Sequence, residues 1–207
     1  MPFLPALFLS LVIVSSACGE QAPAAAMKPE AIRNFQKFPA LTQKLLRYAL
    51  SLTERRLTYT AASADPAKGG MDCSGAVYHV LQKFGFEDVP RQSNDMYAWT
   101  WQANTFRAFN GRTMNSFEMK EIRPGDLLFW TNTTGRTDRD PPVTHVMIYL
   151  GLQASDGRPV MFGSSDGRSY NGTPRYGVGV FDFVLPKALS AARFIGYAHL
   201  PSPTPKP

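Results

Sequence analysis

The chain contains little cysteine and little histidine, and it lacks any dense run of basic residues. Its 207 residues include 2 cysteines, Cys18 and Cys73, and 3 histidines, His79, His145 and His199. These residues offer no pair at metal-ligand spacing, so a metal enzyme is disfavoured and no cofactor is expected. The net charge is +6. Because no Lys/Arg block with interleaved aromatic residues is present, nucleic-acid binding has little support.

Charge is also absent from the first seventeen residues, where an apolar run extends from Phe3 to Val14. That run is shorter than the roughly 20 residues that cross a membrane. Small residues then precede Cys18 and Gly19. The pattern predicts a signal peptide over residues 1–17 and an exported lipoprotein whose lipidated N-terminus is Cys18. Two alternatives stay open: the segment is an ordinary secretory signal whose cleavage also removes Cys18, or it is retained as an anchor.

Export changes the meaning of the basic charge, because anionic cell-wall polymer or lipid would then face it. An ordinary solvated basic surface is the simpler reading. No aspartate follows Cys18 to signal retention at an inner membrane. If the source is Gram-negative, we therefore expect a membrane-anchored protein of the outer membrane or periplasm.

The rest of the chain divides into a tether, a helical segment, a main domain and a tail. Residues 18–28 are Ala/Pro-rich, residues 29–58 carry a helical apolar stripe divided by Pro39, and residues 201–207 form a proline-rich tail expected to be disordered. In the main domain, 59–200, helices are expected after Cys73 and over 92–109. Strands are expected at 127–130, 145–150, 159–162, 178–184 and 194–200, and the third of them ends at residues 163–167. This order predicts an α+β fold, with helices packed on a small antiparallel sheet or open barrel.

Cys73 lies between a glycine-rich loop and a helical pattern. Val77, Val80, Leu81 and Phe84 recur at helical spacing, and Gly85 follows as a stop. A cysteine at a helix N-terminus meets the positive end of the helix dipole, which favours the nucleophilic thiolate. Free cysteines are also among the most buried residues, so this segment alone leaves open a nucleophile and a core cysteine.

A thiol nucleophile needs a base, and the three histidines differ in position. His79 follows Cys73 on the same predicted helix but on another face, and His199 lies next to the tail. His145 opens a strand directly after the polar loop 131–142, where it can face a cleft. Cysteine at a helix start followed by histidine on a sheet is the papain-like chain order.

With these residues the chain resembles the NlpC-type bacterial cell-wall cysteine peptidases, which have a papain-like fold. The similarity covers residues 59–200. It is carried by residues 72–75 (DCSG), 90–93 (PRQS), 123–129 (RPGDLLF) and 145–151 (HVMIYLG), in the order in which the family has them.

The resemblance implies a peptidase that cuts peptidoglycan stem peptides, commonly between D-γ-glutamate and a diamino acid. Cys73 would attack the carbonyl, and His145 would act first as base and then as acid. The backbone N–H of Cys73 would stabilise the oxyanion. Tyr59, Asp72 and Ser74 would hold the free amine end of the substrate. The simpler alternative makes Asp72 a helix N-cap and Ser74 a first-turn residue.

The group that orients His145 is less clearly marked. The family's polar residue on the next strand aligns with Phe162, which cannot accept a hydrogen bond. Alternation along the strand then favours Ser164 first and Asp166 second, although residues 164–167 also read as a polar turn. Two other functions remain open: an inactive wall-binding lipoprotein, and an acyltransferase or amidase that uses the same Cys/His pair.

Overall fold

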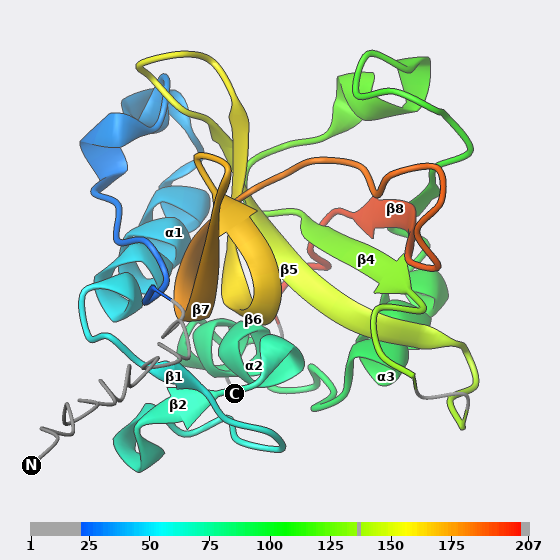
Figure 1. Cartoon of the computed structure of the whole chain (residues 1–207), viewed down its shortest axis with the longest axis horizontal. Coiled ribbons are helices and arrows are strands. Elements are labelled where there is room, and N and C mark those ends of the chain that lie inside the picture. The colour runs from blue at the N-terminus through cyan, green and yellow to red at the C-terminus, as the bar shows by residue number, and fades with distance from the viewer. Residues whose placement is uncertain (1–21, 136–137, 204–207) are drawn as a thin grey trace, which may run out of the picture.

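The computed structural model describes residues 22–135 and 138–203. The predicted signal peptide, Cys18 and the last four residues of the predicted tail lie outside these described residues. Three α-helices are present there, with short 3-10 turns before, between and after them along the chain (Figure 1). The helices are α1 (Ala40–Thr53), α2 (Cys73–Lys83) and α3 (Ser93–Gln102), and the 3-10 turns are η1 (Pro29–Ala31), η2 (Phe35–Lys37), η3 (Pro66–Lys68) and η4 (Phe117–Glu121).

Six strands of the described chain form one antiparallel sheet, in the order β3-β8-β4-β5-β6-β7. Their bounds are β3 (Phe106–Ala108), β4 (Leu127–Thr131), β5 (Val143–Leu152), β6 (Pro159–Tyr170), β7 (Thr173–Asp182) and β8 (Arg193–Ala198). A separate parallel pair joins β1 (Thr58–Tyr59) to β2 (Gly70–Met71). The expected α+β class, with N-terminal helices on an antiparallel sheet in a papain-like arrangement, is confirmed.

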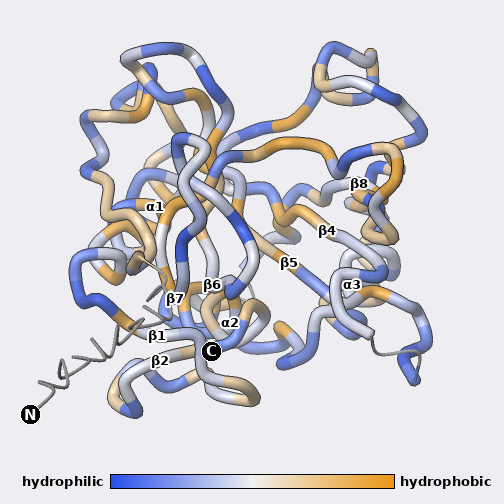
Figure 2. The backbone as a smooth tube through the Cα atoms, viewed as in Figure 1, coloured by the Kyte–Doolittle hydropathy of each residue, from blue (hydrophilic) through white to orange (hydrophobic). Residues whose placement is uncertain are grey.

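Both faces of the sheet are buried, each in its own hydrophobic cluster. Along β4, Leu127 and Phe129 pack into the cluster that contains α1 and α2, whereas Leu128 and Trp130 pack into the second cluster. This alternation follows from the two-residue period of a strand. Hydrophobic stretches along β4 and β5 are visible in Figure 2. Because both faces are covered, only a strand edge or a strand end can open into a cleft.

Local sequence signals set the helix bounds. Pro39 directly precedes α1, where its missing N–H costs no helical hydrogen bond. Asp72 caps α2, and Gly85 follows that helix with a left-handed φ of 84°. Within the described residues, no helix is long and apolar enough to span a membrane.

Three segments differ from the expectation. The helix expected to reach residue 109 ends at Gln102, because Asn104 adopts a left-handed φ of 58° and the next residues pair with β8 as β3. Strand β6 does not turn after residue 162 but continues to Tyr170, through an irregularity between Ser165 and Arg168. Residues 22–28 are not a free tether: Ala24 donates to the Tyr176 carbonyl in β7.

Candidate active site

The start of α2 is held in place by hydrogen bonds and by a close backbone approach. The carboxylate of Asp72 accepts from the Gly75 N–H at 2.6 Å, and the Asp72 N–H donates to the Ser63 carbonyl at 3.0 Å. A Cβ added to Gly75 would lie 2.0 Å from that same carbonyl oxygen. A side chain at this position would therefore push the loop away from the helix. Cys73 is the first residue of α2, and its position is fixed by this packing.

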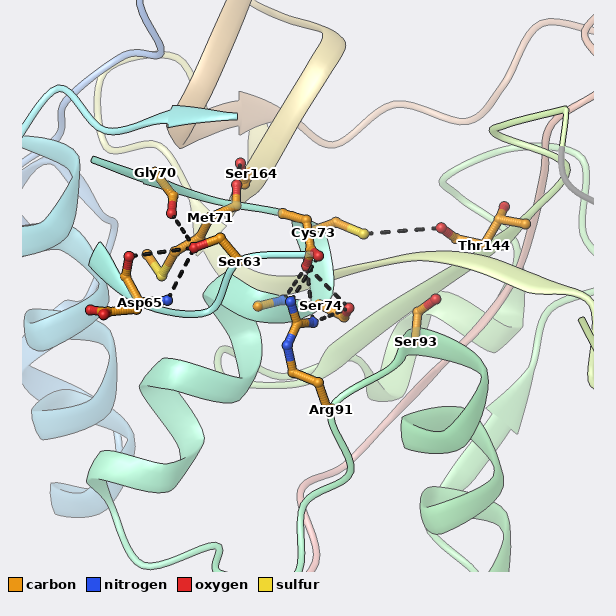
Figure 3. A network of polar contacts seen from close by, with 12 residues as sticks. Ser63, Asp65, Gly70, Met71, Cys73, Ser74, Arg91, Ser93, Thr144 and Ser164 are labelled. Atoms are coloured by element: carbon orange, nitrogen blue, oxygen red, sulfur yellow. Dashed lines mark hydrogen bonds and ion pairs between the residues drawn. The ribbon is translucent and has the colours of Figure 1, made fainter. Parts of the chain in front are cut away.

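The thiol of Cys73 lies against the strand that carries His145. Its Sγ is 4.0 Å from the carbonyl oxygen of Thr144. The backbone N–H of Val146, two residues further along β5, acts to lower the pKa of the thiol. Figure 3 shows the sulfur directed at Thr144. In the described chain β5 pairs with β6 only from Ile148 onward, so the edge at residues 144–146 is open to α2. The thiol of Cys73 therefore lies against the backbone of Thr144, the residue directly before His145.

Asp72 and Ser74 belong to a polar network with Arg91. The two guanidinium Nη groups of Arg91 donate to the two carboxylate oxygens of Asp72, at 3.0 and 2.8 Å. The same side chain donates to the Ser74 hydroxyl at 2.9 Å (Figure 3). Asp72 therefore acts as a helix N-cap and an ion-pair partner at once. A contact of Asp72 and Ser74 with substrate stays a prediction.

His145 contacts an arginine and a tryptophan. The Nε–H of Arg168 donates to the His145 Nε2 at 3.2 Å. The guanidinium carbon of Arg168 lies 4.1 Å from the ring centroid of Trp130, and the rings of Trp130 and His145 are 5.6 Å apart. The side chain of His145 is buried, with 8% of its surface exposed. Burial first, and the charge of Arg168 second, hold its pKa well below the usual value.

A cavity of about 630 Å³ lies beside these groups and includes His145, Arg168 and Tyr59 in its walls. Asn132 and Thr134 line it too, so part of the polar loop 131–142 forms a wall of this cleft. Burial raises the pKa of Tyr59 to about 12, with Cys73 as the next cause. The Tyr59 hydroxyl is therefore a neutral hydrogen-bonding group close to the thiol.

The other two histidines have partners elsewhere. His79 Nε2 lies 2.8 Å from the hydroxyl of Tyr48, between α2 and α1. His199 Nδ1 lies 2.9 Å from a carboxylate oxygen of Asp126, in the turn before β4. Both contacts tie one element to another. Among the three histidines, His145 is the one on the strand that the thiol contacts, directly after Thr144.

A comparison with family models agrees with this geometry, since the model of the NlpC/P60 family matches residues 55–171. The chain belongs to the NlpC/P60 family. No curated protein matches it. The matched range contains Tyr59, Cys73, His145 and Arg168. The family consists of cell-wall hydrolases of the cysteine peptidase type. In the described part of the chain, no group of three or more His, Cys, Asp or Glu residues could hold a metal ion.

In this NlpC/P60 chain the thiol does not show the expected thiolate character. Burial and then the negative charge of Asp72 raise the pKa of Cys73 to about 11, although backbone N–H groups at Val146 and Ser74 act in the opposite direction. The dipole at the helix start is thus outweighed by burial, because Cys73 is only 8% exposed. The resting pair is a neutral thiol and a neutral imidazole.

The expected contact between Ser164 and His145 is not present. The hydroxyl of Ser164 is fully buried and donates to the Met71 carbonyl at 2.6 Å, so it secures β6 to strand β2 shortly before Cys73. Asp166 lies exposed in the β6 irregularity and lines the cavity, without a hydrogen bond to His145 among those of the described residues. The side chain on the imidazole is Arg168, which sequence reasoning missed. Arg168 lies two residues after Asp166, so strand alternation would have placed it on the same face. It was not considered, because the strand was expected to end before residue 168.

Proposed function

We propose that this member of the NlpC/P60 family is an exported cysteine endopeptidase that cleaves peptidoglycan stem peptides. The bond would be the one between a D-γ-glutamyl residue and a diamino acid. One observation carries the proposal: the Cys73 sulfur lies against the backbone on both sides of His145, beside a cavity of about 630 Å³. The family match supports the same chemistry.

The reaction proceeds through a thioester. His145 takes the thiol proton as the Cys73 sulfur bonds to the glutamyl γ-carbonyl carbon. The backbone N–H of Cys73, at the first position of α2, would stabilise the oxyanion. The carbon–nitrogen bond then breaks, and His145 returns its proton to the leaving amine. Water activated by His145 hydrolyses the thioester and regenerates the thiol.

The start of α2 supplies a place for the free amine end of the substrate. Oδ1 of Asp72 already accepts from Gly75, Arg91 and the Ser74 hydroxyl, whereas Oδ2 accepts from Arg91 alone among the described residues. A carboxylate oxygen can accept further hydrogen bonds, so Oδ2 has capacity for an ammonium group. Ser74 and Tyr59 flank this position. The proposal therefore keeps the substrate role of Asp72 next to its role as a cap.

The location of the enzyme is proposed from the sequence of the first residues. An uncharged apolar segment that ends in small residues before Cys18 supports export and a lipid anchor. Anchoring would hold the enzyme in the cell envelope, close to its polymer. Fatty-acid labelling of the protein and of its Cys18→Ala variant, with membrane fractionation, tests this part. Equal labelling of the two proteins would contradict it.

An inactive wall-binding lipoprotein is the second candidate, favoured by the Arg168 contact that occupies His145 Nε2. Digestion of purified peptidoglycan with the protein and with its Cys73→Ala variant separates the two candidates. New peptide products that require Cys73 support the peptidase. Binding without products supports the second candidate. Products with masses expected for transfer to an amine, rather than to water, would indicate an acyltransferase.

A further inference from the structure

His145 has no free basic nitrogen in the arrangement that the structure describes. A neutral imidazole has one N–H and one nitrogen with a lone pair. Because Arg168 donates its Nε–H to Nε2 at 3.2 Å, the lone pair is at Nε2 and the ring proton is at Nδ1. Neither nitrogen can then accept the thiol proton. For His145 to act as a base, the bond from Arg168 must be released.

Arg168 carries a charge that no neighbouring carboxylate balances. Within the described residues it has no ion-pair partner, and its Nη groups have no hydrogen-bond acceptor. Burial lowers the pKa of Arg168 to about 10, while the negative charge of a Cys73 thiolate would raise it. The guanidinium carbon lies 4.1 Å from the centroid of the Trp130 ring, and Arg168 lines the cavity next to His145. A partly buried, unbalanced cation in a cavity wall is a site for an anion.

We propose that a carboxylate of the substrate binds Arg168 and thereby frees His145 to act as the base. An arginine can bind a carboxylate through two parallel N–H groups, and one such pair uses Nε together with an Nη. That pair takes away the same Nε–H that His145 accepts in the resting arrangement. The ring can then carry its proton at Nε2 and present Nδ1 as the base. Arg168 is a positioning residue in this scheme, and it couples recognition to activity.

This inference rests on the proposed function, which also defines the carboxylates that can reach Arg168. A γ-linked glutamyl residue keeps its α-carboxylate free, next to the scissile bond. The diamino acid on the other side of that bond carries a carboxylate of its own. Both groups lie within one residue of the carbonyl that Cys73 attacks. Amidation of one or the other distinguishes the two sources.

The first test compares rates on three synthetic peptides: one with both carboxylates free, one with the glutamyl α-carboxyl amidated and one with the diamino acid carboxyl amidated. For the wild-type protein we expect one of the amidated peptides to be cleaved at least about tenfold more slowly, because its partner for Arg168 is lost. In Arg168→Met the difference should vanish. The matched control is Arg158→Met, which removes an arginine paired with Asp156 at the start of β6 and should keep the wild-type preference. The same preference in Arg168→Met as in the wild type overturns the proposal.

The second test does not need cleavage, so it separates this inference from the proposed function. Nitrogen NMR of the His145 ring reports which nitrogen carries the proton. We expect an Nδ1–H ring in the ligand-free protein, and a change of its nitrogen shifts when a γ-glutamyl dipeptide with a free α-carboxylate is added. The amidated dipeptide should cause no change, and Arg168→Met should differ from the wild type without ligand. An Nε2–H ring in the ligand-free wild type, or identical shifts in wild type and Arg168→Met, contradicts the proposal. If these shifts follow the expectation and no peptide is cleaved, only the proposed function fails.

Discussion

The site has two sides, and each includes an arginine with different partners. The helix wall consists of Cys73 at the start of α2, its cap Asp72, and Arg91 bound to Asp72; the sheet wall consists of His145 on β5 and Arg168 on β6. On the helix wall, both Nη groups of Arg91 meet the carboxylate of Asp72 at 3.0 and 2.8 Å. On the sheet wall, Arg168 meets no carboxylate in the described residues and donates to the imidazole of His145 instead. A cation with its own anion stabilises the fold locally. A cation without one changes the proton affinity of its neighbour and is available to a ligand.

The largest effect is expected at the helix wall, in Cys73→Ala. Turnover should fall by at least about 10³-fold, because the acyl-enzyme cannot form without the sulfur. Thermal unfolding should stay close to that of the wild type, since the change removes one small buried atom. Release of peptides from peptidoglycan measures the first quantity and calorimetry the second. Wild-type activity in this variant would contradict the assignment of Cys73 as the nucleophile.

The next effect is expected at the sheet wall, in His145→Ala. The rate should fall by about 10²–10⁴-fold, because both the base for the thiol and the acid for the leaving amine are lost. His79→Ala is the matched control, since its imidazole contacts Tyr48 at the α1–α2 contact. It should lower the melting temperature more than the rate. A larger loss of rate in folded His79→Ala than in His145→Ala would contradict the assignment.

The comparison of the two arginines predicts different costs in stability. In Arg91→Met, Asp72 keeps its helix cap but loses its cation, and we expect a loss of about 1–3 kcal/mol in the free energy of unfolding. The pair is partly exposed, with side-chain exposures of 31% and 14%, which limits the cost. Arg168→Met should lower the free energy of unfolding less than Arg91→Met does. Methionine can still pack on Trp130, and no carboxylate loses its ion-pair partner. Chemical denaturation of both variants measures the difference. A larger loss of stability in Arg168→Met than in Arg91→Met would contradict the view that only Arg91 has a carboxylate partner.

The smallest effect concerns Asp126, outside the site. Burial raises its pKa to about 6, against the hydrogen bond with His199. The folded protein thus holds this proton more tightly than the unfolded chain does. Its stabilising contribution is full below the ordinary pKa of 3.8 and is lost as the pH rises through about 6.

Relative to Asp126→Asn, the wild-type melting temperature should therefore fall by a few degrees between about pH 4 and pH 7, at roughly 2–4 °C per kcal/mol for a chain of this size. Melting curves of both proteins across that range provide the measurement. A difference that stays constant with pH would show that Asp126 titrates normally.

The parts of the fold and site that could be predicted are those marked by residues next to them in the sequence. Asp72 and Gly85 mark the ends of α2, and the polar loop before His145 marks the start of β5; both are read from neighbouring residues. Arg168 could not be found in this way. Its position depends on an irregularity of β6 opposite β7, which the pairing of two strands determines.

The protonation state of Cys73 was also beyond local reasoning. The helix start is a local feature and favours the thiolate, whereas burial against β5 is a tertiary feature and raises the pKa to about 11. Ser164 shows the same limit. Its place two residues after Phe162 suggested a contact with His145. Packing of β6 on β2 instead lets its hydroxyl donate to the Met71 carbonyl.

Hydrolysis of a defined peptide in water labelled with heavy oxygen tests the central claim most directly. The substrate is L-alanyl-γ-D-glutamyl-diamino acid, and the products are identified by mass spectrometry. A thioester on Cys73 that water opens predicts an alanyl-glutamate dipeptide with one heavy oxygen in its γ-carboxylate, unlabelled free diamino acid, and no product from Cys73→Ala. Cleavage at another bond, or the same products from Cys73→Ala, would contradict the account.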